Sequence, residues 1–285
     1  MAIVYVNGEF VEEENAKISV FDRGFLFADG VYEAISVLRG QLIDAEPHYD
    51  RLGRSLDELG MAWPLERHGL HQMILTLIEH NELTEGMIYF QVTRGAAKRQ
   101  FHFPDPASPS SLVAFTIPMK LIDRPEEVTG VKVVSTEDLR WKRRDIKSIA
   151  LLPQCMGKQF AYENGCYEAL MVEDGMVTEG TSSSAYIIKD NVIITRPLSK
   201  KILPGVTRKA ILKLAEEEDV AIEERLFTLE EAYQADEACL TAASNFIMPI
   251  VEIDGKTIGS GKPGPIVKRL REIYVELALD GSLTK

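Results

Sequence analysis

The sequence predicts an α+β protein, because short strand-forming segments cluster in antiparallel hairpins and amphipathic helices are interspersed among them. Three hairpin turns support this prediction, namely Asn7-Gly8, Arg39-Gly40 and Asp254-Gly255. Each lies between apolar or alternating segments, the pattern that favours tight antiparallel pairing. A repeating β-α-β order is not visible, and the sequence contains no internal repeat, no low-complexity tract and no glycine-rich dinucleotide loop.

The N-terminal part of the chain is expected to form two hairpins, two helices and two further strands. The first helix begins near Glu46 and ends at Gly60, and its leucines share one face. The following stretch, 119–130, is polar, contains proline and has no period, which predicts a linker. The expected strands cover 3–6, 9–11, 31–38, 41–43, 87–93 and 111–118, and the second helix covers 66–80.

After the linker, strands and helices are again expected to be interspersed. The last helix has an apolar face at helical spacing over 265–279. The other expected helices cover 150–164 and begin near Thr207 and Thr228. The expected strands are 131–135, 168–173, 185–195 with a turn at Asp190-Asn191, 238–242 and 250–258. The sequence therefore predicts an N-terminal α/β domain (1–118), a linker (119–130) and a C-terminal domain (131–285).

Composition excludes several classes of protein. The chain has 285 residues, 45% of them apolar and 27% charged, which is typical of a globular protein. Its formal net charge of -12 argues against a nucleic-acid partner, because phosphate binding needs a basic face. No apolar run approaches the ~20 residues that span a bilayer, and the start lacks a signal-peptide pattern. Cys155, Cys166 and Cys239 are scattered, as expected of free thiols. We therefore expect a cytoplasmic protein without a membrane partner.

Three short segments contain residues suited to hold pyridoxal 5'-phosphate (PLP). Residues 143–148 include Lys147, 177–184 include Glu179 and a hydroxyl cluster, and 203–208 contain a Gly-Val-Thr turn that opens a helix. A lysine amine can form a Schiff base with the PLP aldehyde, and a glutamate after a strand can keep the pyridine nitrogen protonated. Hydroxyls and helix N-terminal amides can bind the phosphate. Taken singly, these residues would be a surface lysine, a turn, a polar loop and a helix cap.

Longer stretches of the chain resemble the fold type IV PLP enzymes and, among them, the D-amino acid aminotransferases. The matching stretches are 21–33 (FDRGFLFADGVYE), 89–95 (YFQVTRG), Asp145-Ile146-Lys147 and 259–265 (GSGKPGP). They occur in the order of the family and extend over nearly the whole chain. The resemblance implies two α/β domains with PLP at their interface, the C-terminal one being the PLP-binding domain, and assembly as a homodimer. It implies no metal.

The resemblance also implies roles for individual residues. Lys147 is expected to form the Schiff base and to shuttle protons, Glu179 to pair with the pyridine nitrogen, and Arg51 to bind the phosphate. Without the resemblance, Arg51 would be an ordinary charge on a helix surface; Glu33 is expected to be structural. The implied cofactor-binding residues are Arg51, Lys147, Glu179, Ser183, Val206, Thr207 and Ala243, and the implied substrate-binding residues are Tyr32, Arg99 and His102.

The sequence departs from the family pattern at two places. At the expected phosphate loop, Ala242 and Ala243 stand where the family usually has hydroxyls, so any phosphate contact there must come from backbone amides. The family also has Arg-x-His after the 89–95 strand, as the trap for the substrate carboxylate. Here Arg99 matches, Phe101 stands at the position of the histidine, and His102 lies one residue later. In an extended segment such a shift turns a side chain to the other face, whereas in a loop it need not.

The resemblance implies ping-pong transamination of D-amino acids with a 2-oxo acid as acceptor. The departure at Phe101 keeps an (R)-selective amine transaminase as the nearest alternative. A branched-chain aminotransferase is less expected because its Arg-x-x-x-Tyr-Arg-Gly signature is absent, and an aminodeoxychorismate lyase would differ after the lysine. A PLP-binding protein without catalysis, or a binder that is no enzyme, is disfavoured because Lys147, Glu179 and Arg51 are all present.

Overall fold

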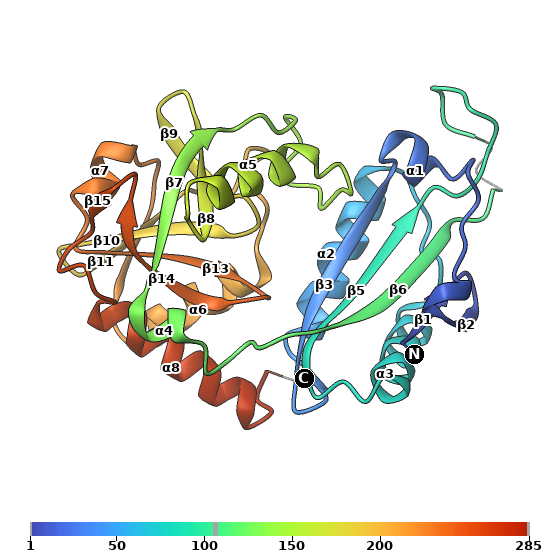
Figure 1. Ribbon diagram of the computed structural model, residues 1–285, viewed down its shortest axis with the longest axis horizontal. Helices are drawn as coiled ribbons and strands as arrows, with labels where there is room; N and C mark the ends of the chain where they lie inside the picture. The colour runs from blue at the N-terminus through green and yellow to red at the C-terminus, as the bar shows by residue number, and fades with distance from the viewer. Residues whose placement is uncertain (1, 105–107, 284–285) are drawn as a thin grey trace. The chain divides into compact units, whose positions relative to one another are not determined.

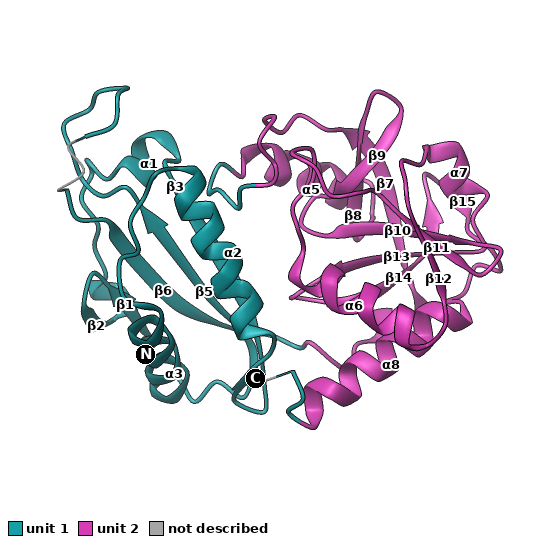
Figure 2. Cartoon of the chain, turned by 180° about the vertical axis from the view of Figure 1, so that it is seen from behind, with its two compact units in different colours: residues 1–120, 146–150, 281–285 teal, residues 121–145, 151–280 magenta. Residues whose placement is uncertain are grey.

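The computed structural model describes residues 2–104 and 108–283 (Figure 1). The chain divides into two compact units (Figure 2). Unit 1 comprises residues 1–120, 146–150 and 281–285, and unit 2 comprises residues 121–145 and 151–280. The short segment that contains Lys147 therefore belongs to unit 1 by its contacts, whereas the sequence predicts it in the C-terminal domain.

In its described part, unit 1 is built on a six-stranded sheet of order β2-β1-β6-β5-β3-β4, in which all neighbouring strands are antiparallel. Two helices, α2 and α3, accompany this sheet (Figure 1). The elements are β1 (Ile3–Val6), β2 (Glu9–Glu12), the 3-10 helix η1 (Glu13–Asn15), α1 (Arg23–Phe27), β3 (Gly30–Leu38), β4 (Gln41–Leu42), α2 (Ala45–Glu58), α3 (Arg67–His80), β5 (Glu85–Thr93) and β6 (Ser111–Pro118).

Strand β3 shows how the two faces of this sheet differ. Alternate residues of a strand point to opposite faces. Val31, Ile35 and Val37 are fully buried and join the core formed with α2 and α3. Each such side chain stabilises the fold by ~1.5–3 kcal/mol through the apolar area that it removes from water. Glu33 lies on this buried face, whereas Tyr32 lies on the other face and is only partly buried.

Unit 2 contains, among the described residues, a nine-stranded mixed sheet in which β12-β11-β10-β13-β14-β7-β8-β9 are neighbours and β15 pairs with β14. Helix α8 packs against β13 and β14, and α5 packs against β8 (Figure 1). The elements are α4 (Pro125–Thr129), β7 (Val131–Glu137), α5 (Leu152–Glu163), β8 (Glu168–Glu173), β9 (Met176–Gly180), β10 (Ser184–Lys189), β11 (Val192–Thr195), α6 (Val206–Glu217), β12 (Ala221–Glu224), α7 (Leu229–Tyr233), β13 (Glu237–Ala242), β14 (Phe246–Ile253), β15 (Lys256–Thr257) and α8 (Pro265–Leu279).

Most expected elements are present, and one correction concerns the candidate site. Glu179 lies inside strand β9, not after a strand as expected. Strand β9 escaped prediction because its polar residues, Thr178 and Glu179, are buried instead of marking a solvent face. Helices α1 and α4 and strand β12 were not predicted either, and all three have at most five residues.

Two kinds of feature are absent from the described residues. No helix there is both long enough and apolar enough to cross a membrane. Among the same residues, no group of three or more His, Cys, Asp or Glu side chains could hold a metal ion.

Candidate active site

In unit 1, backbone hydrogen bonds attach the Lys147 segment to the start of β3. The Tyr32 amide donates to the Lys147 carbonyl oxygen at 3.0 Å, and the Ile149 amide donates to the Gly30 carbonyl oxygen at 3.1 Å. The segment can approach so closely because residue 30 is glycine. A Cβ there would lie 2.6 Å from the Val92 carbonyl oxygen and 3.1 Å from Ile149 Cδ1. These hydrogen bonds therefore fix the backbone position of Lys147.

The Lys147 amine lies over an aromatic ring. Its Nζ is 4.1 Å from the centroid of the Tyr32 ring, a distance at which the ring quadrupole attracts an ammonium group. Tyr32 stacks on Tyr89 with 5.4 Å between ring centroids, and Tyr89 stacks on Phe115 at 4.9 Å. The predicted residues Lys147 and Tyr32 are therefore brought together, on a row of rings that crosses β3, β5 and β6.

Arg51 belongs to a buried cluster and not to the helix surface. Its side chain is 9% exposed, so the alternative reading as a surface charge is wrong. The guanidinium donates from Nε to Glu33 Oε1 and from Nη2 to Glu33 Oε2, both at 2.8 Å. His48 Nδ1 lies 2.6 Å from Glu33 Oε2. This two-pronged contact fixes the plane of the guanidinium, and Glu33 has the structural role expected of it.

Charges within this cluster shift two pKa values. Burial alone would raise the pKa of Glu33, but the charge and hydrogen bonds of Arg51, together with His48, lower it to about 2. The pKa of His48 is lowered, first by burial; Glu33 acts in the opposite direction, and the charges of Arg51 and Lys147 lower it further. Glu33 is therefore an anion and His48 a neutral ring at neutral pH.

The predicted substrate residues Arg99 and His102 lie in the loop after β5, and both are exposed. The Arg99 guanidinium carbon lies 5.2 Å from the Phe27 ring centroid and 5.7 Å from the Phe101 ring centroid. Phe101, at the position of the family's histidine, is 83% exposed. Within the described residues, no carboxylate pairs with Arg99, and the structure shows no contact that joins Arg99 or His102 to Tyr32.

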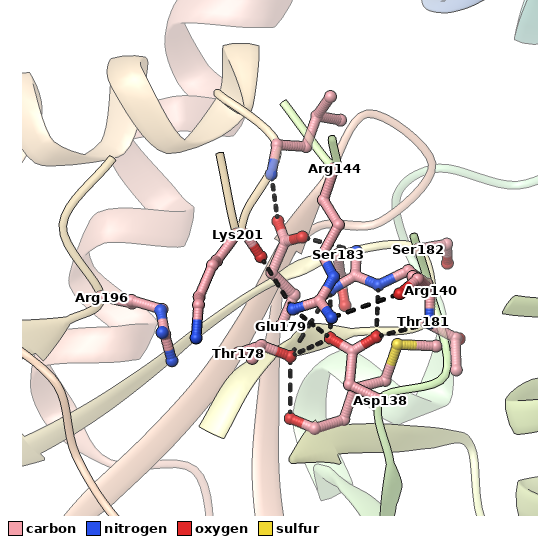
Figure 3. Close-up of polar contacts among 12 residues, drawn as sticks. Asp138, Arg140, Arg144, Thr178, Glu179, Thr181, Ser182, Ser183, Arg196 and Lys201 are labelled. Carbon is pink, nitrogen blue, oxygen red and sulfur yellow. Dashed lines mark hydrogen bonds and ion pairs between the residues drawn. The ribbon is translucent and has the colours of Figure 1, made fainter. Parts of the chain in front are cut away.

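In unit 2, Glu179 is buried and both of its oxygens accept hydrogen bonds (Figure 3). Arg140 Nη1 donates to Oε2 at 2.7 Å, and the Leu203 amide donates to Oε1 at 3.1 Å. Burial raises the pKa of Glu179; the charge and hydrogen bond of Arg140 and the Leu203 amide offset this only in part, and the Asp138 charge adds a smaller rise. The Leu203 contact ties β9 to the segment that leads into α6.

Arg140 and Asp138 are site residues that sequence reasoning missed. Arg140 contacts Asp138 through Nε at 3.0 Å and Nη2 at 2.8 Å, and the Thr178 hydroxyl donates to Asp138 Oδ2 at 2.6 Å. The sequence does contain one signal for this pair, because Asp138 and Arg140 have opposite charges and lie two residues apart, soon after an apolar strand. That pattern also occurs at exposed turns, so only the fold identifies the partner of Arg140 as Glu179.

The hydroxyl cluster after β9 surrounds a second buried carboxylate, that of Glu168. Its Oε1 accepts from Ser183 Oγ at 2.9 Å, from Thr181 Oγ1 at 3.0 Å and from the Ser182 amide at 2.9 Å. The proton of the predicted cofactor residue Ser183 is therefore directed at Glu168. Gly180 permits this arrangement, because a Cβ there would overlap Ser183 Oγ and the Glu168 carboxylate.

Helix α6 begins without a side-chain cap. Gly205 occupies the N-cap position and makes no side-chain hydrogen bond, and Val206 and Thr207 follow as buried residues of the first turn. First-turn amides of a helix are free of intrahelical partners and attract anions. The predicted phosphate residues Val206 and Thr207 are thus at a helix start, as expected. Ala243 lies in the turn between β13 and β14.

Comparison with known proteins assigns the family. The sequence model described as "Amino-transferase class IV" matches residues 30–253. The chain therefore belongs to the class IV aminotransferase family, and the resemblance found in its motifs is confirmed.

The curated relatives of this chain include proteins named D-alanine aminotransferase. The Staphylococcus epidermidis protein is 41% identical over 274 residues, which cover 95% of this chain and 96% of the relative. The Bacillus licheniformis protein is 39% identical over 280 residues, which cover 98% of this chain and 96% of the relative. The likeness thus extends over nearly the full length of each protein.

Solved structures of similar fold include branched-chain aminotransferases. A T.th. branched-chain amino acid aminotransferase with pyridoxamine 5'-phosphate has a TM-score of 0.90 at 25% identity, covering 96% of this chain and 93% of that one. The Thermoproteus uzoniensis enzyme with norvaline has a TM-score of 0.85 at 27% identity, covering 98% and 95%. The predicted α+β fold of the fold type IV enzymes is confirmed.

Proposed function

We propose that this chain is a PLP-dependent aminotransferase that moves the amino group of D-amino acids, with D-alanine as the type substrate, to a 2-oxo acid. The observation that carries the proposal is the Lys147 amine, which a hydrogen-bonded segment holds over the Tyr32 ring. The full-length likeness to D-alanine aminotransferases supports the choice of reaction.

The residues present fit this cofactor. When bound, PLP supplies an aldehyde that condenses with amines and a ring that accepts electron density from the substrate Cα. The uncapped first turn of α6, with Val206 and Thr207, suits a phosphate, and so does the cation of Arg51. Glu179, buried and bonded to Arg140, suits a protonated ring nitrogen. The proposed contacts are completed by Ser183, through its amide because its hydroxyl donates to Glu168, and by the turn amide of Ala243.

Lys147 has two tasks in the proposed reaction. Its amine would hold the cofactor through the aldehyde in the resting enzyme, and when free, Nζ would take the proton from the substrate Cα. The ring of Tyr32 beside Nζ would attract the ammonium that forms when Nζ takes up the proton. A side chain so placed acts as a general base, a role that typically accelerates proton transfer by ~10²–10⁴-fold.

The choice of a D-amino acid rests on sequence, because the fold does not decide it. The structural neighbours named branched-chain aminotransferases share 24–27% of residues with this chain, and the curated relatives named D-alanine aminotransferase share 38–41%. The stretch YFQVTRG at 89–95 also lacks the signature expected of the branched-chain enzymes.

An (R)-selective amine transaminase is the second candidate, and one observation favours it. Phe101 replaces the histidine of the carboxylate trap, and its exposed ring lies beside Arg99. Less polar amines need no carboxylate partner. We therefore expect D-amino acids to be preferred and (R)-amines to react more slowly.

The test compares three amino donors with the purified holoenzyme. Initial rates are measured for D-alanine, L-valine and (R)-1-phenylethylamine with 2-oxoglutarate as acceptor, following glutamate formation. The proposal predicts the highest kcat/KM for D-alanine. A higher value for L-valine would overturn the stereochemical assignment, and a higher value for the amine would favour the second candidate.

A further inference from the structure

In its buried site, the Glu179 carboxylate contacts the guanidinium of Arg140, which also contacts the carboxylate of Asp138 (Figure 3). We propose that Arg140 is a positioning residue that, held by Asp138, fixes the Glu179 carboxylate in one orientation and opposes its protonation, so that it can pair with the cofactor ring nitrogen. This inference rests on the proposed function, which assigns Glu179 to that nitrogen.

The contacts of Arg140 use its planar shape. The edge formed by Nε and Nη2 contacts both oxygens of Asp138, while Nη1 donates to Glu179 Oε2 at 2.7 Å. The Arg140 backbone amide also donates to Asp138 Oδ1 at 3.1 Å, which closes a small ring. A guanidinium that is anchored by two parallel hydrogen bonds cannot rotate about its own axis. The direction of Nη1 toward Glu179 is therefore fixed.

Asp138 is itself held from several sides. The Thr178 hydroxyl donates to its Oδ2 at 2.6 Å, and Arg144 Nη1 lies 3.2 Å from the same oxygen. Because Thr178 precedes Glu179 in β9, Asp138 is anchored to the strand whose carboxylate Arg140 contacts. Neither Asp138 nor Arg140 is accessible enough to exchange its partners for water, since their side chains are 0% and 7% exposed.

The charges around Glu179 show what Arg140 contributes. The groups that face it are Arg140 and Asp138 from the segment after β7, the Leu203 amide before α6, and Arg196 after β11. Without Arg140, the Asp138 and Glu179 carboxylates would repel each other in a buried place. Glu179 would then take up a proton more readily. A protonated Glu179 no longer favours a proton on the ring nitrogen.

A lysine could supply the charge but not the geometry. Its ammonium is a point charge on a flexible stem, whereas the fork of arginine binds two carboxylates in defined directions. Arg140→Met therefore tests charge and geometry together, and Arg140→Lys tests geometry with the charge retained. Arg144→Met is the control, because it also removes a buried arginine from Asp138, while among the described residues the other contacts of Arg144 include the Arg140 carbonyl oxygen and Glu173 but not Glu179.

The first readout needs no cofactor. Apoprotein with ¹³C-labelled glutamate carboxyl groups is titrated by NMR, and the Glu179 signal is assigned by its loss in Glu179→Gln. We expect Arg140→Met to raise the Glu179 midpoint by about one pH unit or more, roughly a tenfold change in proton affinity. Arg140→Lys should raise it less, and Arg144→Met should leave it unchanged.

The second readout uses the PLP-loaded enzyme. In Arg140→Met, the absorption spectrum and its pH profile should shift toward those of Glu179→Gln, with kcat reduced ~10–100-fold and KM for D-alanine changed little. In Arg140→Lys, kcat should fall although the Glu179 midpoint moves less than in Arg140→Met. Arg144→Met should lose thermal stability but retain the parent pH profile.

Three results would overturn the inference. They are an unchanged Glu179 titration in folded Arg140→Met, an equal shift in Arg144→Met, or failure of both Arg140 variants to fold while Arg144→Met folds. The last result would make Arg140 a residue of stability alone. If instead the proposed function is wrong, Glu179→Gln would transaminate at the parent rate. The apoprotein titration would then still show that Arg140→Met raises the Glu179 midpoint.

Discussion

Two neighbouring residues of β3 serve two different groups. Tyr32 points to the partly exposed face, where its ring lies under the Lys147 amine, and Glu33 points to the buried face, where it holds Arg51 and His48. The alternation of a strand thus separates a lysine and an arginine that have different proposed tasks. The family resemblance implied Tyr32 as a substrate residue, and the alternation of β3 places Glu33 on the buried face, where it is structural.

At the residue scale, we predict that Arg99 is the main anchor of the substrate carboxylate. Arg99→Ala should lower kcat/KM for D-alanine about 10–100-fold, the effect of losing a hydrogen bond to a charged group. It should lower the value for (R)-1-phenylethylamine far less, because this amine has no carboxylate. Lys98→Ala removes a neighbouring cation and serves as control. Equal losses on both substrates in Arg99→Ala would show that Arg99 is structural.

Single elements differ in how well the sequence predicts them. Helix α8 has its predicted bounds, because its apolar spacing is regular and Pro265 stands at its start. The β10–β11 turn is also confirmed, since Asp190 and Asn191 adopt the positive φ values of a tight hairpin. In contrast, the contact of Arg140 with Glu179 depends on β7, β8 and β9 being neighbours in the sheet. No local pattern reports that order, so motifs located Glu179 but not its partners.

At the element scale, we predict that the first turn of α6 binds the phosphate of PLP. Thr207→Val keeps the side-chain shape and removes a hydroxyl, so apoprotein should bind PLP about tenfold more weakly. Thr228→Val is the control, because the Thr228 hydroxyl caps its own helix by accepting from the Glu231 amide at 3.1 Å. That variant should lose stability and keep its PLP affinity. The dissociation constants are measured by fluorescence quenching; equal affinities in the two variants would contradict the assignment.

The whole molecule should lose stability in acid, because buried groups of unit 1 have lowered pKa values. A carboxyl whose pKa falls to about 2 on folding stabilises the protein above its unfolded value near 4.5, and this contribution disappears as the pH falls toward 2. His48 acts in the same direction from about pH 6.5 downward, since its pKa is also lowered by folding.

We therefore predict that the free energy of unfolding depends on pH less steeply in Glu33→Gln than in the parent between pH 5 and pH 2. The difference should amount to about 3 kcal/mol, because folding lowers the pKa of Glu33 from 4.5 to about 2. Urea unfolding at several pH values measures it. Glu46→Gln removes an exposed carboxylate from its pair with Arg67 and should change little. Parallel curves for Glu33→Gln and the parent would contradict the role of Glu33.

At the scale of the whole molecule, the proposed function depends most on Lys147. Homodimer assembly and a cytoplasmic location remain predictions. The holoenzyme is reduced with borohydride, digested, and analysed by mass spectrometry for a phosphopyridoxyl group on lysine. We predict this group on Lys147, its loss together with nearly all turnover in Lys147→Ala, and its retention in Lys142→Ala, which changes an exposed lysine nearby. A modified lysine elsewhere, or an unmodified Lys147 in active enzyme, would contradict the proposed function.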